Sequence, residues 1–179
     1  LLAALVDARI AEGEIGAAEA ASRRLTELAD ESGIPVVTAR AGLAAARAHV
    51  AAERRDAAAE AARGALADFG SMAMPYETAQ ARLELARALA QGSPDLAVEE
   101  ARSAYASFRE LGASRARDDA AALLRSLGAP TGGLPRGVGE LTASNLRHEW
   151  VHHDREHLAQ LMAVSSSLAW PAMGNSRRF

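Results

Sequence analysis

Four of the five histidines lie within the stretch HEWVHHDREH at 148–157. Imidazole nitrogens are common ligands of Zn²⁺ and Ni²⁺, and two histidines four positions apart on a helix project from the same face. The stretch contains two such pairs, His148 with His152 and His153 with His157. At about 100° per residue the two pairs lie on nearly opposite faces of a helix. The spacing therefore predicts two separate half-sites rather than one site with four histidine ligands.

The pair His153 and His157 is the better candidate for a metal site. Apolar side chains gather on its side of the predicted helix, namely Leu146, Trp150, Leu161 and Val164. His148, Glu149 and His152 have the His-Glu-x-x-His spacing of zinc metalloproteases, but two ligands make only half a site and this pair lies away from the apolar face, so we do not predict that reaction. Three interpretations of the two histidine pairs stay open. In the first, which we favour, the histidines are polar residues of a solvated tail. In the second they bind a metal within this chain, and in the third they form a half-site that another molecule completes.

A longer segment around these histidines, NLRHEWVHHDREHLAQLMAV followed by WPAMGNSRRF, resembles the last helix and tail of DinB-type four-helix bundles. In that family a His-x-x-x-His pair on the last helix joins a histidine from an earlier helix around a divalent metal. The resemblance implies that His153 and His157 are ligands of Zn²⁺ or Ni²⁺ and that the activity is that of a thiol transferase or hydrolase. The third ligand would be His49, the only histidine upstream.

The rest of the chain is rich in alanine and reads as a series of helices. Of its 179 residues 49% are hydrophobic but only 4% are aromatic, which favours thin, closely packed helices over a sheet. Asp56 is expected to cap the fourth helix. Helices joined by short turns must lie antiparallel, so we predict an all-α chain of helical hairpins. Glycine and proline divide the sequence into seven helical blocks, at about 1–12, 15–31, 35–54, 56–70, 75–90, 94–111 and 114–127.

An internal repeat relates these blocks at an offset of 40 residues, which aligns Pro75 with Pro35. At that offset the matching pairs are Pro35/Pro75, Thr38/Thr78, Ala39/Ala79, Ala41/Ala81, Leu43/Leu83, Ala46/Ala86, Arg47/Arg87, Ala48/Ala88, Ala57/Ala97, Glu60/Glu100 and Ala61/Ala101. A helical hairpin that repeats with such a period is typical of an α-solenoid of the tetratricopeptide type. We expect alanines to let the paired helices approach closely (Ala46, Ala86, Ala61 and Ala101) and larger side chains to fill the space between hairpins (Leu43, Leu83, Leu85, Phe69 and Phe108). The concave face between the first helices of adjacent hairpins is the expected binding surface.

Residues 75–128, PYETAQARLELARALAQGSPDLAVEEARSAYASFRELGASRARDDAAALLRSLG, resemble the helical-repeat region of large LuxR-type transcriptional regulators. The resemblance covers roughly residues 1–142, and its last part, AALLRSLGAPTGGLPRGVGELTA, is similar to the linker into the family's DNA-binding domain. It implies a protein-interaction or signal-relay role within a larger regulator. The residues after Thr142 are too few for the family's helix-turn-helix and contain no basic recognition helix, so no direct DNA binding is expected.

Composition limits the remaining classes of function. The formal net charge of −3 predicts no general attraction to nucleic acid or anionic membranes, and no run of residues is apolar enough to predict a membrane span. The chain has no cysteine, which excludes thiolate ligands and is compatible with the cytoplasm. It opens inside an apolar helical pattern, so we expect a fragment-like chain with a repeat domain (1–128), a Gly/Pro-rich linker (129–141) and a C-terminal helix and tail (142–179). We predict a cytoplasmic, non-enzymatic module that binds a protein partner or a neighbouring domain.

Overall fold

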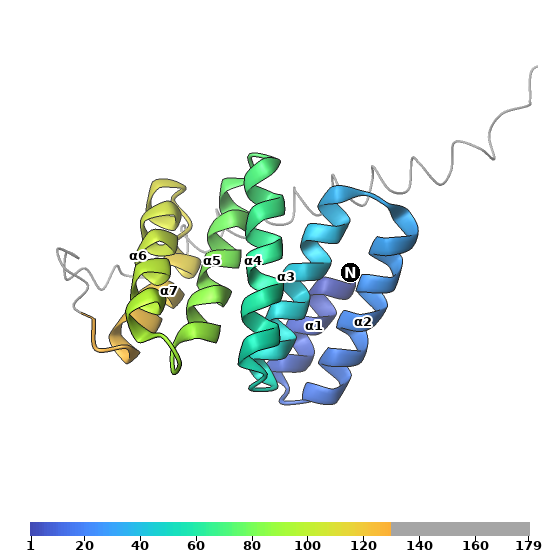
Figure 1. Cartoon of the computed structure of the whole chain (residues 1–179), viewed down its shortest axis with the longest axis horizontal. Coiled ribbons are helices and arrows are strands. Elements are labelled where there is room, and N and C mark those ends of the chain that lie inside the picture. Colours follow the sequence, from blue (N-terminus) through green and yellow to red (C-terminus); the bar gives the residue numbers. More distant parts are fainter. Residues whose placement is uncertain (130–179) are drawn as a thin grey trace, which may run out of the picture. The chain divides into compact units, whose positions relative to one another are not determined.

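The computed structural model of the chain describes residues 1–129, which contain seven α-helices and no strand (Figure 1). This confirms the predicted all-α class for the described part of the chain. The predicted linker and C-terminal helix lie outside it, apart from Ala129. None of the described helices is both long enough and apolar enough to cross a membrane. The helices are α1 (Leu2–Ala11), α2 (Ile15–Ser32), α3 (Pro35–Ala51), α4 (Arg55–Ser71), α5 (Pro75–Leu89), α6 (Pro94–Glu110) and α7 (Ser114–Ser126).

Consecutive helices pack against each other as three hairpins, α1–α2, α3–α4 and α5–α6, followed by α7 (Figure 1). The first helices of successive hairpins also contact one another, in the pairs α1 with α3, α3 with α5 and α5 with α7. The second helices, α2, α4 and α6, make no such contacts with each other within the described residues. We call α1, α3, α5 and α7 the inner helices and α2, α4 and α6 the outer helices. Because only the inner helices approach one another, they line the narrower side of a stacked array, as predicted for an α-solenoid.

Local sequence sets the helix ends. Proline occupies the first turn of α3, α5 and α6, where its missing N–H breaks no helical hydrogen bond. After α2 the chain turns at Gly33, whose φ of 61° lies in the left-handed region. One repeat later the same conformation falls on Ala73, with φ of 54°. In the left-handed conformation the Cβ atom of alanine clashes with the backbone, and glycine has no Cβ atom. The turn at Ala73 is therefore strained.

The prediction that Asp56 caps α4 is wrong. The helix begins at Arg55, with Arg54 in the N-cap position, and no side chain makes a capping hydrogen bond. Glu53, at φ of 59°, turns the chain just before Arg54, so the N-cap falls two residues before Asp56. Asp56 therefore lies inside the first turn, where its carboxylate can interact only with the helix dipole.

Alanine supplies most of the buried core, which explains how the helices approach closely without aromatic side chains. Ala46, Ala86 and Ala101 are fully buried, as predicted for contacts within hairpins, whereas Ala61 is only half-buried. The larger side chains predicted to fill the remaining space are also buried (Leu43, Leu83, Leu85, Phe69 and Phe108). Phe108 meets the ring of Tyr76 edge-on, with ring centroids 5.8 Å apart, and so joins α5 to α6.

The predicted repeat offset aligns the inner helices correctly. Between α4 and α6 it is wrong, because the true offset is one residue shorter. All five of the predicted inner-helix pairs of apolar residues from Ala39/Ala79 to Ala48/Ala88 are buried. In the outer helices the buried residues match at an offset one position shorter: Ala58/Ala97, Ala62/Ala101, Ala65/Ala104 and Phe69/Phe108. The cause lies in the helix starts, because α3 and α4 begin at 35 and 55, whereas α5 and α6 begin at 75 and 94. The matches of Ala57, Glu60 and Ala61 at the longer offset are therefore coincidences of composition.

Candidate functional site

The inner helices line an open hollow of about 410 Å³, which we call the inner hollow. Residues from α1, α3, α5 and α7 line it, together with Phe108 of α6. Its walls are largely apolar and include Ile10, Val50, Leu83 and Ala116. This is the position at which the sequence predicted a binding surface, between the first helices of adjacent hairpins.

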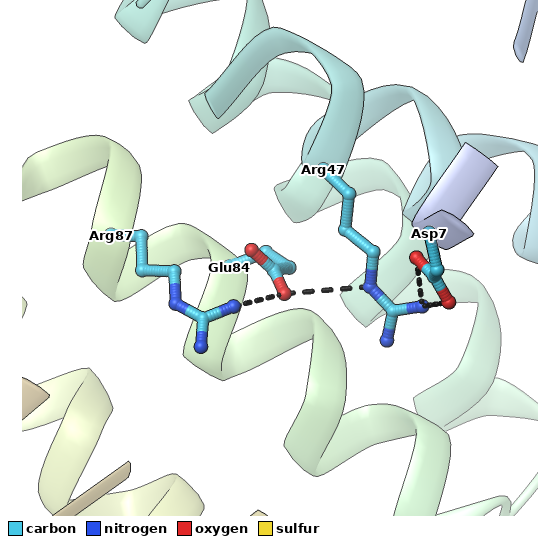
Figure 2. A network of polar contacts seen from close by, with 4 residues as sticks. All are labelled: Asp7, Arg47, Glu84 and Arg87. Atoms are coloured by element: carbon cyan, nitrogen blue, oxygen red, sulfur yellow. Dashed lines mark hydrogen bonds and ion pairs between the residues drawn. The ribbon is translucent and has the colours of Figure 1, made fainter. Parts of the chain in front are cut away.

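Four charged side chains of the inner hollow form one connected network (Figure 2). On α3, Arg47 donates from Nη1 to both carboxylate oxygens of Asp7 on α1, at 3.1 and 2.9 Å. The Nε of the same arginine lies 3.4 Å from Oε1 of Glu84 on α5. That oxygen also accepts a hydrogen bond of 2.7 Å from Nη1 of Arg87. The network therefore joins three successive inner helices through Arg47.

Burial differs sharply between the two carboxylates that contact Arg47. The side chain of Glu84 is 4% exposed, whereas that of Asp7 is 50% exposed. A buried carboxylate is stable only when charged donors compensate it, and Glu84 has two. Glu84 is thus the fixed centre of the network, and Asp7 is its solvent-exposed end.

A second ion pair repeats this arrangement two helical turns away. Arg40 of α3 lies 3.7 Å from Oε1 of Glu77 on α5, seven residues before Arg47 and Glu84 respectively. Residues seven apart lie on the same face of a helix, so both pairs join the same faces of α3 and α5. Both pairs therefore join the second hairpin to the third.

The charges in the network of Asp7, Arg47, Glu84 and Arg87 sum to zero. A partner that enters the inner hollow therefore meets apolar walls around a compensated polar base rather than a patch of one charge. An arrangement of this kind suits apolar side chains of a peptide or helix. Asp119 of α7 adds one exposed carboxylate at the lining of the inner hollow.

The sequence predicted the place of the inner hollow but not the residues of its network. Arg47 and Arg87 enter the sequence pattern only as one match of the internal repeat. A usable signal is present, because Asp7 precedes Arg47 by one full repeat and so takes the same position in α1. Charged residues at one repeated position of three neighbouring helices are expected to meet. Glu84 cannot be found in this way, because the matching residues of α1 and α3 are alanines.

His49, the suggested third metal ligand, is already engaged. Its Nδ1 lies 2.9 Å from Nη2 of Arg54, and a guanidinium can only donate, so Nδ1 accepts. The same guanidinium pairs with Glu19 of α2. Burial and the charge of Arg54 lower the pKa of His49 below its ordinary value, while Glu19 acts in the opposite direction. Protonation of His49 would oppose the contact with Arg54.

Within residues 1–129 no three or more histidine, aspartate or glutamate side chains are grouped so that they could hold a metal ion. The predicted ligands His153 and His157 lie outside the described residues, so the structure does not test their pairing with His49.

The described region defines a class, an all-α protein of stacked helical hairpins with a hollow on its inner face. No protein-family model matches the chain, and no curated protein or solved structure matches it either.

Proposed function

We propose that this chain is a non-enzymatic helical-repeat module that holds a protein partner in the inner hollow. The supporting observation is that equivalent positions of successive inner helices supply the lining, so one concave surface extends over several repeats. The partner contributes apolar side chains that contact Ile10, Val50 and Ala116. Resemblance to the repeat region of LuxR-type regulators supports a relay role within a larger regulator.

Charge compensation within the hollow distinguishes this function from binding of nucleic acid. Because Arg47 and Arg87 are neutralised by Glu84 and Asp7, binding depends mainly on buried apolar area. The affinity for the partner is therefore expected to change little between about 50 and 500 mM salt, whereas phosphate contacts would weaken it steeply.

Peptide selection tests the proposal and does not require an identified partner. Displayed random peptides of about 12 residues would be selected on the immobilised full chain, long enough to span neighbouring inner helices. Ala116→Arg fills the inner hollow and is expected to weaken the selected peptides about tenfold or more. Ala67→Arg is the matched control, because Ala67 is exposed on the outer helix α4. Equal effects of the two substitutions on variants with unchanged helicity would refute binding in the inner hollow.

A second substitution guards against a folding defect in the first. Ala51→Arg places the same side chain on the α3 lining of the inner hollow, at a half-buried position. It is expected to weaken the same peptides.

The alternative function, a DinB-like metal-binding protein using His153 and His157, rests on the sequence resemblance alone.

A further inference from the structure

One carboxylate of the inner hollow stands outside its charge network. Asp119 of α7 is exposed and lines the hollow, but it forms no hydrogen bond or ion pair with another residue of the described region. Its neighbour Asp118 pairs with Arg117 at 2.9 Å. Arg115, one helical turn before Asp119, makes no ion pair with it either. Within residues 1–129 the charge of Asp119 is therefore left without a partner.

Exposure shows which charges of the inner hollow a partner meets. Both arginines of the network are drawn toward the buried carboxylate of Glu84, and the side chains of Arg47 and Arg87 are 21% and 35% exposed. Asp7 is 50% exposed, and Asp119 is exposed as well. The lining contains three carboxylates and two guanidiniums, which leaves one negative charge. A basic side chain therefore complements this surface better than an acidic one.

Apolar side chains lie beside Asp119. Ala116, one helical turn earlier on α7, lines the same hollow and packs against the cluster that contains Leu83 and Phe108. Lysine and arginine have long methylene stems that pack on such a surface while the charged head stays in water. A basic side chain of a partner can therefore lie along Ala116 with its head at the carboxylate of Asp119.

Asp119 faces the inner hollow rather than the far side of α7. With the first residues of α5 and α7 aligned, Asp119 takes the place of Gln80, which lines the hollow from α5. Ala79 of α5, which packs on α6 and α7, has Asp118 as its counterpart. Successive residues of a helix point about 100° apart. An element packed on the far side of α7 would therefore cover Asp118 rather than Asp119.

We infer that the partner segment in the inner hollow carries an arginine or lysine that pairs with Asp119, next to an apolar side chain that contacts Ala116. This inference rests on the proposed binding function and names the chemistry of the partner. The pair is exposed to solvent, so it adds little affinity. Its main effect is to orient the segment, with the basic residue at the α7 end of the hollow.

Peptide selection on three forms of the full chain tests the pairing. Peptides that are selected on the parent chain and weakened by Ala116→Arg are expected to carry a basic residue at a fixed distance from an apolar one. Selection on Asp119→Lys is expected to replace that basic residue with aspartate or glutamate. Asp118→Lys is the matched control, because Asp118 is adjacent, exposed and changes the charge equally. Selection on this control is expected to keep the basic residue.

Affinities of one selected peptide give the magnitude. Asp119→Asn is expected to weaken its binding about two- to fivefold, as for an exposed ion pair. Asp119→Lys is expected to weaken it about tenfold, because two like charges then meet. Replacing the basic residue of the peptide with glutamate is expected to restore binding to Asp119→Lys, which a purely structural effect of the substitution would not allow.

Two results separate failure of this inference from failure of the proposed function. Peptides that Ala116→Arg weakens but that show no basic residue, or the same basic residue on Asp119→Lys, would overturn the inference and leave binding in the inner hollow intact. Peptides that Ala116→Arg does not weaken would refute the proposed function, and this inference with it.

A crosslinker at position 119 tests the other occupants of the hollow. The chain has no cysteine, so Asp119→Cys offers a single thiol for benzophenone maleimide. On illumination with the selected peptide, the label is expected to attach to the peptide, and to do so less from Asp118→Cys. Attachment to a second copy of the chain or to its residues 130–179, unchanged by excess peptide, would show that one of these fills the hollow and would overturn the inference.

Discussion

Replacing Glu84 with glutamine is expected to destabilise the array more than replacing Asp7 with asparagine, although Asp7 is the closer partner of Arg47. Both substitutions keep the shape of the side chain and remove one negative charge from the network in Figure 2. The distances are 2.9 Å from Arg47 to Asp7 and 3.4 Å to Glu84. Glu84 has a second guanidinium partner, Arg87, at 2.7 Å, so the comparison combines the effects of burial and of the number of partners.

Burial sets the expected magnitudes. Hydrogen bonds to a charged group contribute about 1.5–3 kcal/mol when shielded from water, against about 0.5–1.5 kcal/mol for neutral ones. Glu84 is 4% exposed and contacts two guanidiniums, so Glu84→Gln is expected to cost about 1–2 kcal/mol. Asp7 is 50% exposed, and exposed ion pairs contribute about 0.2–1 kcal/mol. Asp7→Asn is therefore expected to cost less than about 0.5 kcal/mol.

Urea unfolding followed by far-UV circular dichroism measures both changes, with an unchanged m value as the condition for comparing them. A double-mutant cycle with Arg47→Met and Glu84→Gln should give a coupling energy of about 1 kcal/mol. An equal or larger cost for Asp7→Asn would refute the reasoning from burial. A coupling energy near zero would show that Arg87 alone compensates Glu84.

Three further outcomes are expected. Ala73→Gly should stabilise the chain by about 0.5–1 kcal/mol, because it relieves a left-handed alanine at some cost in unfolded-state entropy; thermal unfolding measures the rise in Tm. The neutral imidazole of His49 favours the folded state, since its pKa is lowered from 6.5, so its contribution is complete above about pH 6.5 and is lost as the pH falls below that value. Urea unfolding from pH 7.5 to 5.5 should thus show a weaker pH dependence for His49→Gln. The metal-binding alternative predicts about one equivalent of Zn²⁺ or Ni²⁺ per purified chain, abolished by His157→Ala.

Each of these outcomes has a control. Gly33→Ala places alanine in the same left-handed position one repeat earlier, where a Cβ atom meets no neighbour, and should destabilise the chain. For His49 the difference between parent and variant cancels the other four histidines, and an unchanged pH profile would contradict the role of Arg54. In the metal analysis His49→Ala separates a three-ligand site from a pair, and purified chain without metal at neutral pH would count against the DinB-like alternative.

Helix positions can be predicted from the sequence because their signals are local. Proline at 35, 75 and 94 and glycine at 13, 33 and 112 mark helix ends through their own backbone preferences, whatever the rest of the chain does. The inner-helix repeat is visible for a related reason, since Pro35/Pro75, Leu43/Leu83 and Arg47/Arg87 are matches that alanine abundance does not produce.

Alanine abundance hides the one-residue shift between α4 and α6, since Ala97 matches Ala57 and Ala58 equally well. Less common residues reveal it, because Phe69/Phe108 and Arg63/Arg102 match only at the shorter of the two offsets. Burial also distinguishes the two offsets, because a helix turned by one residue, about 100°, would expose its buried alanines.

By itself the sequence determined the all-α class of the described region, the order of its helices and the repeat that aligns the inner ones. Tertiary structure alone decided that Glu84 is buried between two arginines. The physical reason is the distance along the chain over which each kind of interaction acts. Propensities and caps act within one or two turns, whereas Asp7, Arg47 and Arg87 are each separated by a full repeat and converge only once the hairpins have stacked.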